Sequence, residues 1–441
     1  MCKNLEQVDK NIASTSFVIP LNWNTKKLRN LVTNNGNYGS GAAALEFNPN
    51  LPRYVRITDI TDQGCLDPES FASITYERAK GYFLQKGDLL FARSGATVGK
   101  TYLYDEADGE CAHAGYVIKF SLDSSVCDPK FIAQFTRSSF YWMWVNRTLR
   151  QGAQPNINAE EYKTINIPCP PLNEQQKIAE ILDTIDKAIA LTSTHITKLK
   201  KAKAGLLHDL LTRGIDDHGE LRDYTRNPEL FKRSPLGIIP KDWDVGPLSS
   251  IANLQVGYAF KSQCFQENEG IRLIRGENVG YGRPDWSDTK RLPWDMYRGY
   301  KEYELSEGDI IIGMDRTFTK SGCKISVLDS DDIPSLLVQR VGRFIAHSCN
   351  IEFLKVLLIS ETYQLSLQLQ QKGMDIPHLS QSEILEPIVP IPLPKEQIKI
   401  AQVVATHEAH LQSKKVYLEK LKLLKQGLMS DLLTGRVRVK I

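Results

Sequence analysis

The feature of this sequence that most constrains its fold is a long segment that occurs twice. Residues 392–434 repeat residues 170–212 without a gap, at an offset of 222, and 17 of the 43 positions are identical. Unrelated segments of ordinary composition would share about two or three. A repeat spaced by half the chain indicates two copies of one structural unit.

Both copies have the apolar spacing of a long helix with one hydrophobic face. Apolar residues recur at alternating steps of four and three, which predicts the seam of a coiled coil. About 38 residues at about 1.5 Å each give a rod of about 57 Å, and such a rod needs a partner. We interpret the other copy as that partner; two separate amphipathic core helices are the alternative. The predicted seam consists of Ile178, Leu182, Ile185, Ile189, Ile196, Leu199, Leu206 and Leu210 in the first copy and Ile400, Val404, Leu411, Leu418, Leu421, Leu428 and Leu432 in the second.

Polar residues interrupt the seam, and local signals mark the helix ends. The interruptions are Thr192, Lys203, His407, Lys414 and Lys425. At the start of the first copy, residues 173 and 176 resemble a capping box. Residues 214 and 435, both glycine, stand where a C-terminal glycine would end each helix.

The duplication extends beyond the helices. Residues 19–23 (IPLNW) match residues 239–243 (IPKDW), and residues 84–88 (LQKGD) match residues 305–309 (LSEGD). Arg56 with Ile60 matches Arg275 with Val279, and Gly152 with Pro155 matches Gly373 with Pro377. Between these anchors the two halves differ greatly. A shared framework therefore carries two different variable surfaces.

These patterns predict an α+β fold, with two pseudo-repeated domains of twisted sheet and helices separated by two long antiparallel helices forming a coiled coil. In the first domain, runs at 54–57, 88–91 and 116–118 predict strands, and residues 129–149 predict an aromatic-rich helix. The expected organisation is a tail (1–16), a first domain (17–169), a first long helix (170–213), a solvated linker (214–236), a second domain (237–391), a second long helix (392–435) and a tail (436–441).

Composition indicates a soluble globular protein, with 41% hydrophobic and 24% charged residues. The apolar runs are too short to span a bilayer, and the eight scattered cysteines favour reduced thiols in a cytoplasm. A net charge of +3 permits nucleic-acid binding without arguing for it.

The sequence shows no convincing catalytic or metal-binding motif. Residues 94–101 (SGATVGKT) resemble a P-loop, but the residues after them predict an extended segment where a phosphate-binding helix would have to begin. His407 and His410 have no evident partner ligand. Asp285, Asp288 and Lys290 suggest a nuclease cluster only loosely. We therefore expect no catalytic residue, cofactor site or metal site on this chain.

The doubled pattern resembles the specificity subunit of type I restriction–modification systems. Each half opens with Ile-Pro-x-x-Trp, and its long helix begins with PPLNEQQKIAEIL or IPLPKEQIKIAQVV and ends with LLHDLLTRG or LMSDLLTGRV. The resemblance covers residues 17–436. Residues 394–395 (Pro-Lys) replace the usual polar pair before Glu396, which blurs only where that helix begins.

The resemblance implies a non-catalytic, sequence-specific DNA-binding subunit. Its two target-recognition domains would each read one half of a bipartite, asymmetric site in double-stranded DNA, and its helices would set the gap. Two methyltransferase subunits would dock on it with S-adenosylmethionine, and restriction–translocase subunits would use ATP and Mg. The alternative is a coiled-coil scaffold without DNA readout.

Loops that follow equivalent anchors supply the candidate DNA contacts, because Arg and Lys suit guanine or phosphate whereas Asn and Gln suit adenine. For any one of these residues, an ordinary solvated loop side chain is the alternative. The candidates are Arg93, Ser94, Thr97, Lys100, Arg150, Gln151, Gln154 and Asn156 in the first domain and Arg316, Thr317, Thr319, Lys320, Gln371, Lys372 and Asp375 in the second.

Overall fold

The computed structural model describes residues 7–8, 19–149, 154–319, 322–370 and 378–440. Contacts divide the chain into two units, residues 1–194 with 416–441 and residues 195–415. Each unit therefore combines one globular domain with part of each long helix, so the helices belong to both units.

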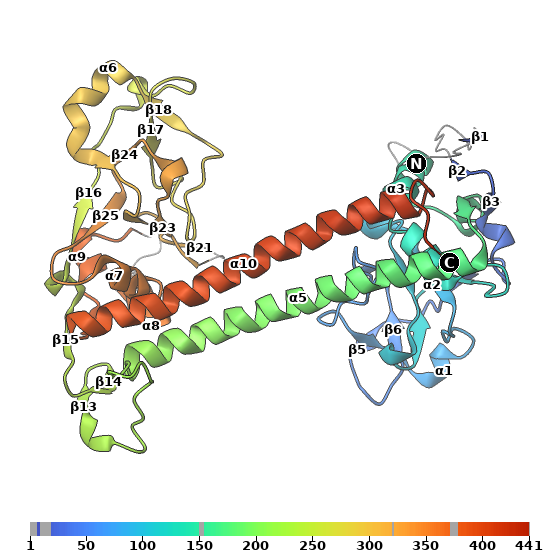
Figure 1. The fold of residues 1–441 in the computed structure, drawn as a ribbon, viewed down its shortest axis with the longest axis horizontal. Helices are drawn as coiled ribbons and strands as arrows, with labels where there is room; N and C mark the ends of the chain where they lie inside the picture. Colours follow the sequence, from blue (N-terminus) through green and yellow to red (C-terminus); the bar gives the residue numbers. More distant parts are fainter. Residues whose placement is uncertain (1–6, 9–18, 150–153, 320–321, 371–377, 441) are drawn as a thin grey trace. The chain divides into compact units, whose positions relative to one another are not determined.

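The first unit contains two four-stranded sheets and short two-stranded ladders (Figure 1). One sheet is antiparallel, in the order β4 (Asn37–Tyr38), β11 (Val117–Ser121), β8 (Asp88–Ala92), β9 (Thr101–Leu103). The other has the order β10 (Cys111–His113), β6 (Arg53–Val55), β7 (Ala72–Ser73), β5 (Leu45–Glu46), with β10 parallel to β6. The ladders pair β3 (Asn24–Lys27) with β12 (Asn166–Cys169) and β1 (Gln7–Val8) with β2 (Ile19–Pro20). The short helices are α1 (Tyr76–Ala79), α2 (Pro129–Phe135), α3 (Ser139–Thr148) and α4 (Ala159–Tyr162).

The second unit repeats this plan. Its antiparallel sheet has the order β16 (Ala252–Val256), β25 (Val341–Ala346), β20 (Ile310–Gly313), β23 (Ile325–Val327). Its other sheet has the order β18 (Lys290–Leu292), β17 (Ile271–Ile274), β24 (Ser335–Leu337), β19 (Glu304–Leu305), with β17 parallel to β24. The two-stranded ladders are β15 (Asp244–Pro247) with β26 (Ile388–Ile391), β13 (Phe231–Ser234) with β14 (Gly237–Pro240), and β21 (Phe318–Thr319) with β22 (Gly322–Cys323). The short helices are α6 (Trp294–Tyr297), α7 (Ile351–Leu358), α8 (Glu361–Gln370) and α9 (Gln381–Leu385).

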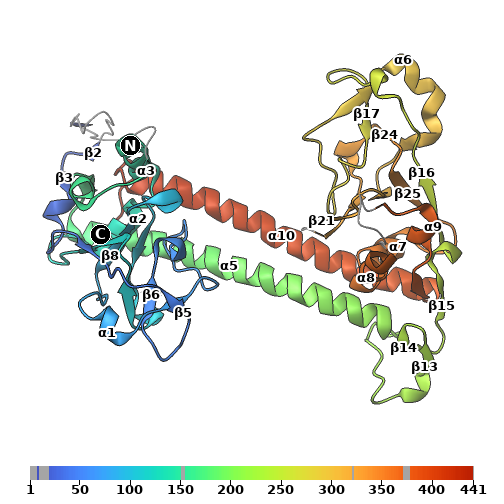
Figure 2. The same cartoon turned by 180° about the vertical axis from the view of Figure 1, so that it is seen from behind.

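The two long helices are α5 (Leu172–Thr212) and α10 (Pro394–Leu432). In the first unit the start of α5 and the end of α10 share one apolar core, through residues such as Leu182 and Leu432. In the second unit the end of α5 and the start of α10 share another, through residues such as Leu210 and Ile400. The helices are therefore antiparallel within each unit (Figures 1 and 2). The α+β architecture with two repeated domains and two long helices is confirmed.

Three local predictions need correction. The predicted helix 129–149 is two helices, because Ser138 begins α3 by accepting a hydrogen bond from the Tyr141 N–H. The capping box is not formed: α5 already begins at Leu172, and the Asn173 carboxamide accepts from the adjacent Glu174 N–H. The linker 214–236 is not simply solvated, because Ile215 is buried in the second core.

The carboxylate that begins α10 ties the second unit together. Glu396 accepts a hydrogen bond from the Trp243 indole at 2.9 Å and from Arg222 Nη2 at 3.0 Å. Burial opposes the charge on Arg222, but the hydrogen bonds and charge of Glu396 outweigh it, so the pKa of Arg222 is raised. Gly214, which ends α5 with φ 67°, packs against the same group. A Cβ there would lie 2.2 Å from Glu396 Oε1 and 2.5 Å from Trp243 Cζ2, so only glycine fits.

The first unit has the equivalent arrangement at the start of α5. Glu174 accepts from the Trp23 indole at 3.1 Å and from Arg438 Nε and Nη2 at 2.7 and 2.8 Å. Gly435, with φ 71° after α10, lies against Trp23. In each unit, the arginine that follows one long helix therefore binds the glutamate that begins the other. We call each set of Trp, Glu and Arg a clamp.

Replacing Glu396 with glutamine should destabilise the protein by about 3 kcal/mol, because it leaves the buried Arg222 guanidinium with only the more exposed Asp242, at 3.4 Å, as a counter-charge. The Arg222 side chain is only 13% exposed, whereas that of Arg438 is 39% exposed, so the same change at Glu174 should cost less. Chemical denaturation of the three proteins measures both differences.

Glu180→Gln is the matched control, because the Glu180 side chain is 66% exposed and pairs with Lys177 within one turn. Its effect should stay below about 0.5 kcal/mol. Equal effects of the changes at Glu396 and Glu180 would contradict the clamp.

Candidate nucleic-acid interface

Three chain segments meet where β8 ends in the first domain. The Arg93 N–H donates to the Tyr116 carbonyl at 3.1 Å, and the Arg93 carbonyl accepts from the Ile157 N–H at 2.9 Å. The Gly95 N–H donates to the Pro155 carbonyl at 3.1 Å. We call residues 93–95, 116 and 156 the first corner.

The Arg93 side chain contacts neighbouring side chains at the first corner. Arg93 Nε donates to the Asn156 carboxamide oxygen at 3.3 Å. The Arg93 guanidinium also lies 4.8 Å from the centre of the Tyr38 ring, where cation–π attraction holds it. Asn156 and Tyr116 are exposed. The predicted candidates Arg93, Ser94 and Asn156 therefore lie together at the surface.

The second domain has a corner on the same frame. The Met314 N–H donates to the Arg340 carbonyl, and the Met314 carbonyl accepts from the Leu379 N–H, both at 2.9 Å. His378 Nδ1 lies 2.7 Å from Asp315 Oδ1. Arg340 Nη1 lies 3.1 and 2.8 Å from the two nitrogens of His378. Because those nitrogens point in different directions, the guanidinium lies against the face of the ring. We call residues 314–316, 340 and 378 the second corner.

The other predicted DNA-contact residues differ in their exposure and in their contacts. Gln154, Arg316 and Thr319 are exposed, and Ser94 and Thr97 are half-buried. Lys100 is paired with Asp62 at 2.8 Å. Thr317 is fully buried and donates to the carbonyls of Gly313 and Met314, so its prediction as a DNA contact is withdrawn. The candidates outside the described residues are Arg150, Gln151, Lys320, Gln371, Lys372 and Asp375.

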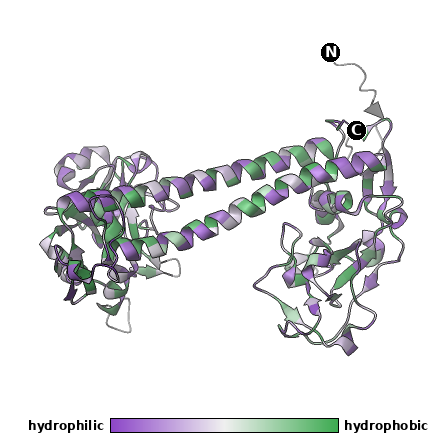
Figure 3. Cartoon of the chain, turned by 60° about the horizontal axis from the view of Figure 1, so that its bottom comes forward, coloured by the Kyte–Doolittle hydropathy of each residue, from purple (hydrophilic) through white to green (hydrophobic). Residues whose placement is uncertain are grey.

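The long helices have the side-chain distribution that the seam requires. Every predicted seam residue is buried or half-buried, whereas the exposed positions of the helices are mostly hydrophilic, with Leu191, Leu423 and Leu424 among the apolar exceptions. Both colours alternate along the helices in Figure 3. The helix ends add buried residues that the seam pattern missed, namely Leu207, Leu211, Met429 and Leu433. These residues belong to the apolar cores of the two domains.

Two of the polar interruptions form ion pairs between the helices. Lys203 of α5 binds Glu408 of α10 at 2.6 Å, with Lys355 at 3.7 Å from the same carboxylate. In the other unit, Lys425 of α10 binds Asp186 of α5 at 2.6 Å. Lys203 and Lys425 occupy equivalent positions of the repeat, as do Asp186 and Glu408. The two equivalent ion pairs therefore fit the same antiparallel register of α5 and α10.

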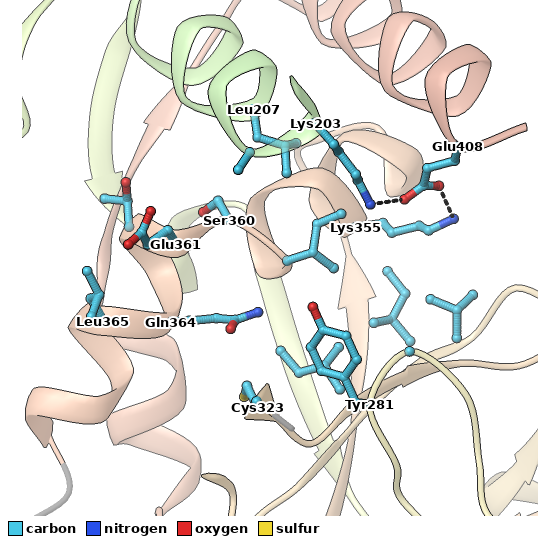
Figure 4. A pocket seen from close by; sticks show the side chains of 18 of the residues that line it. Lys203, Leu207, Tyr281, Cys323, Lys355, Ser360, Glu361, Gln364, Leu365 and Glu408 are labelled. Carbon is cyan, nitrogen blue, oxygen red and sulfur yellow. Dashed lines mark hydrogen bonds and ion pairs between the residues drawn. The ribbon is translucent and has the colours of Figure 1, made fainter. Parts of the chain in front are cut away.

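A cavity of about 1100 Å³ adjoins the first of these ion pairs. It lies among α5, α7, α8 and the strands around β21, and Tyr281 and Gln364 point into it (Figure 4). At the equivalent place in the first unit, α3 carries Trp142, which reaches the backbone at Gly99.

The segments whose motifs suggested phosphate or metal binding form strands and ion pairs instead. The P-loop-like segment leads into strand β9, as predicted. Asp288 accepts hydrogen bonds from Arg275 and Lys290, and these bonds hold its pKa below the ordinary value. Among the described residues, no group of His, Cys, Asp and Glu could hold a metal ion. The search of the same residues for a helix able to cross a membrane found none.

Sequence reasoning missed the corner residues Tyr116, Arg340 and His378, and it missed Tyr38, whose ring lies against Arg93. His378 follows Pro377 as Asn156 follows Pro155, so the matched Gly–Pro anchors could have indicated it. Tyr116 and Arg340 each precede the valine that begins an equivalent strand. No sequence signal placed Tyr38 beside Arg93.

Comparison with known proteins identifies the family. The model of the type I restriction modification DNA specificity domain matches residues 20–201 and again residues 240–423. The chain belongs to this family. Catalysis in type I enzymes belongs to other subunits, and the specificity subunit is not itself an enzyme.

Relatives match either most of the chain or a part of it. The type I restriction enzyme MjaVIII specificity subunit of Methanocaldococcus jannaschii is 30% identical over 363 residues, covering 82% of this chain and 81% of the relative. The EcoAI specificity subunit of Escherichia coli is 34% identical over 164 residues, covering 37% of this chain and 28% of the relative. The type I restriction–modification S subunit from M. genitalium has a similar fold, with a TM-score of 0.57 at 17% identity, covering 95% of this chain and 97% of that one. The family assignment replaces the scaffold interpretation.

The equivalent ion pairs predict equivalent energetics. In a double-mutant cycle, replacing Lys203 and Glu408 with alanine should reveal a favourable coupling of about 1 kcal/mol, because both side chains are less than a third exposed. The cycle at Lys425 and Asp186 should give a similar value. Denaturation of each single and double variant measures the coupling.

The exposed pair Lys177–Glu180, which lies within α5, provides the control. Its coupling should be about 0.3 kcal/mol. A coupling at Lys203–Glu408 no larger than this control would argue against a register contact.

Proposed function

We propose that this chain is the DNA-reading subunit of a type I restriction–modification enzyme, in which each domain reads one half of a bipartite site. The observation that carries the proposal is the pair of corners. The same backbone hydrogen bonds present Arg93, Ser94 and Asn156 in one domain but Met314, Asp315 and His378 in the other. Different polar groups on a common frame suit different base sequences, so the recognised site is asymmetric.

The long helices act as the spacer between the half-sites. Asp186 and Lys203 are 17 residues apart on α5, as are Glu408 and Lys425 on α10. Equal spacing lets both ion pairs form in one antiparallel register without a slip between the helices. A fixed register gives a fixed separation of the two domains, and half-site spacing then follows from geometry.

Partner subunits supply the chemistry. Two methyltransferase subunits dock on the duplicated framework, whose two clamps provide equivalent surroundings, and they bring S-adenosylmethionine and flip the target adenine. Restriction–translocase subunits add cleavage that requires ATP and Mg. The net charge of only +3 fits a chain whose partners make many of the phosphate contacts. The assembly works in the cytoplasm.

Lengthening both helices together tests the spacer. Seven residues that continue the seam are inserted after Thr194 and after Lys415, where the division between the units crosses the helices. They add about 10 Å, which corresponds to about three base pairs. Adenine methylation by the complex with its methyltransferase subunit, mapped on a DNA library, should show both half-sites unchanged and the gap longer by about three base pairs.

Five-residue insertions at the same two places are the matched control. Five residues do not match the seven-residue repeat of the seam, so the apolar residues beyond the insertion are turned by about 140° around each helix. The two helices then no longer pair along their whole length, and methylation should be lost. An unchanged gap after the seven-residue insertion would contradict the spacer function.

A further inference from the structure

We propose that one arginine in each domain reads a guanine of its half-site: Arg93 in the first domain and Arg340 in the second. This inference rests on the proposed function and adds to it the residues that determine specificity. The two arginines occupy different positions of the common frame, so the two guanines lie at different points of their half-sites.

Backbone contacts establish which positions are equivalent. The turn before β11 has a hydrogen bond from the Val117 N–H to the Ala114 carbonyl, and the turn before β25 has one from Val341 to Val338. The residues between them, Tyr116 and Arg340, each accept a hydrogen bond from the chain that leaves the neighbouring strand. Position 340 therefore corresponds to 116, just as 314 corresponds to 93.

Arg93 is held in place while part of its guanidinium stays available. The Nε atom is used by Asn156, and the face of the guanidinium is covered by Tyr38. Among the described residues, none accepts a hydrogen bond from its two terminal nitrogens. Two parallel N–H donors on a fixed plane match the O6 and N7 acceptors of guanine in the major groove.

Arg340 is held in a comparable way by different groups. The side chain lies against the His378 ring, with Nε 3.8 Å from Asp315, and it remains 49% exposed. Asp315 in turn contacts His378 at 2.7 Å. Among the described residues, none accepts a hydrogen bond from Nη2. A guanidinium oriented by an acid and a ring loses less entropy when it binds a base.

Backbone strain supports a function for the second corner. Among the described residues, Arg316 and Arg340 are the non-glycine residues with positive φ, at 48° and 70°. The first corner has Gly95 at the position of Arg316. The fold therefore accepts glycine at that position, and the second domain keeps a strained arginine instead. Such strain persists where the side chain has a role beyond folding.

Base preference measured position by position tests the assignment. The complex with its methyltransferase subunit methylates a library with randomised half-sites, and sequencing reads the sites that are used. Arg93→Gln should reduce the preference for one G·C pair in one half-site by about tenfold to a hundredfold, with the other half-site unchanged. Arg340→Gly should do the same in the opposite half-site.

The glycine variant also separates reading from folding. Because glycine accepts positive φ, Arg340→Gly should keep or raise the melting temperature while its guanine preference is lost. A lower melting temperature would show that the arginine serves the fold. Arg78→Ala and Arg298→Ala, which remove exposed arginines elsewhere in the two domains, should leave every base preference intact.

Two other outcomes are decisive. Uniformly weaker methylation with unchanged base preferences in Arg93→Gln and Arg340→Gly would show phosphate contacts and would overturn guanine reading. If the unmodified complex shows no bipartite preference at all, the proposed function fails, and this inference fails with it in a distinguishable way.

Discussion

The structure depends on a buried carboxylate at the start of each long helix. Glu174 and Glu396 each accept hydrogen bonds from a tryptophan of the adjoining domain and an arginine that follows the other helix. A carboxylate is stable in such a place only when several donors satisfy it. One group therefore fixes a domain, a helix start and a helix end together, and it does so at both ends of the repeat.

This arrangement explains why some segments are closely similar in the two halves of the chain whereas others differ. The repeated residues Glu174, Gln175 and their copies bond to backbone or indole groups of the framework. The exposed corner residues bond mainly to one another, so they can change without disturbing the sheets. A rigid frame with variable exposed polar groups is what a protein that reads two different DNA sequences requires.

The sequence predicted the helices well but indicated only some of the residues that meet at the two corners. Apolar spacing identified the seam because helix periodicity is local, and Gly214 and Gly435 marked the helix ends. The clamping arginines were missed because Arg222 and Arg438 bond across 174 and 264 residues of sequence, which no local pattern reports. Thr317 looked like a loop contact, yet its hydroxyl satisfies the turn itself. Arg340 and His378 are far from Asp315 in the sequence, and backbone pairing between their segments brings them together, so no local pattern indicated the contact.

The central claim is that a duplicated frame presents two different reading surfaces at one fixed separation. Genome-wide mapping of methylated adenines in cells that contain this chain and its partner subunits tests it most directly. The account predicts one non-palindromic sequence in two parts, separated by a constant number of unspecified base pairs. A palindromic site, a continuous site or a gap of variable length would contradict it.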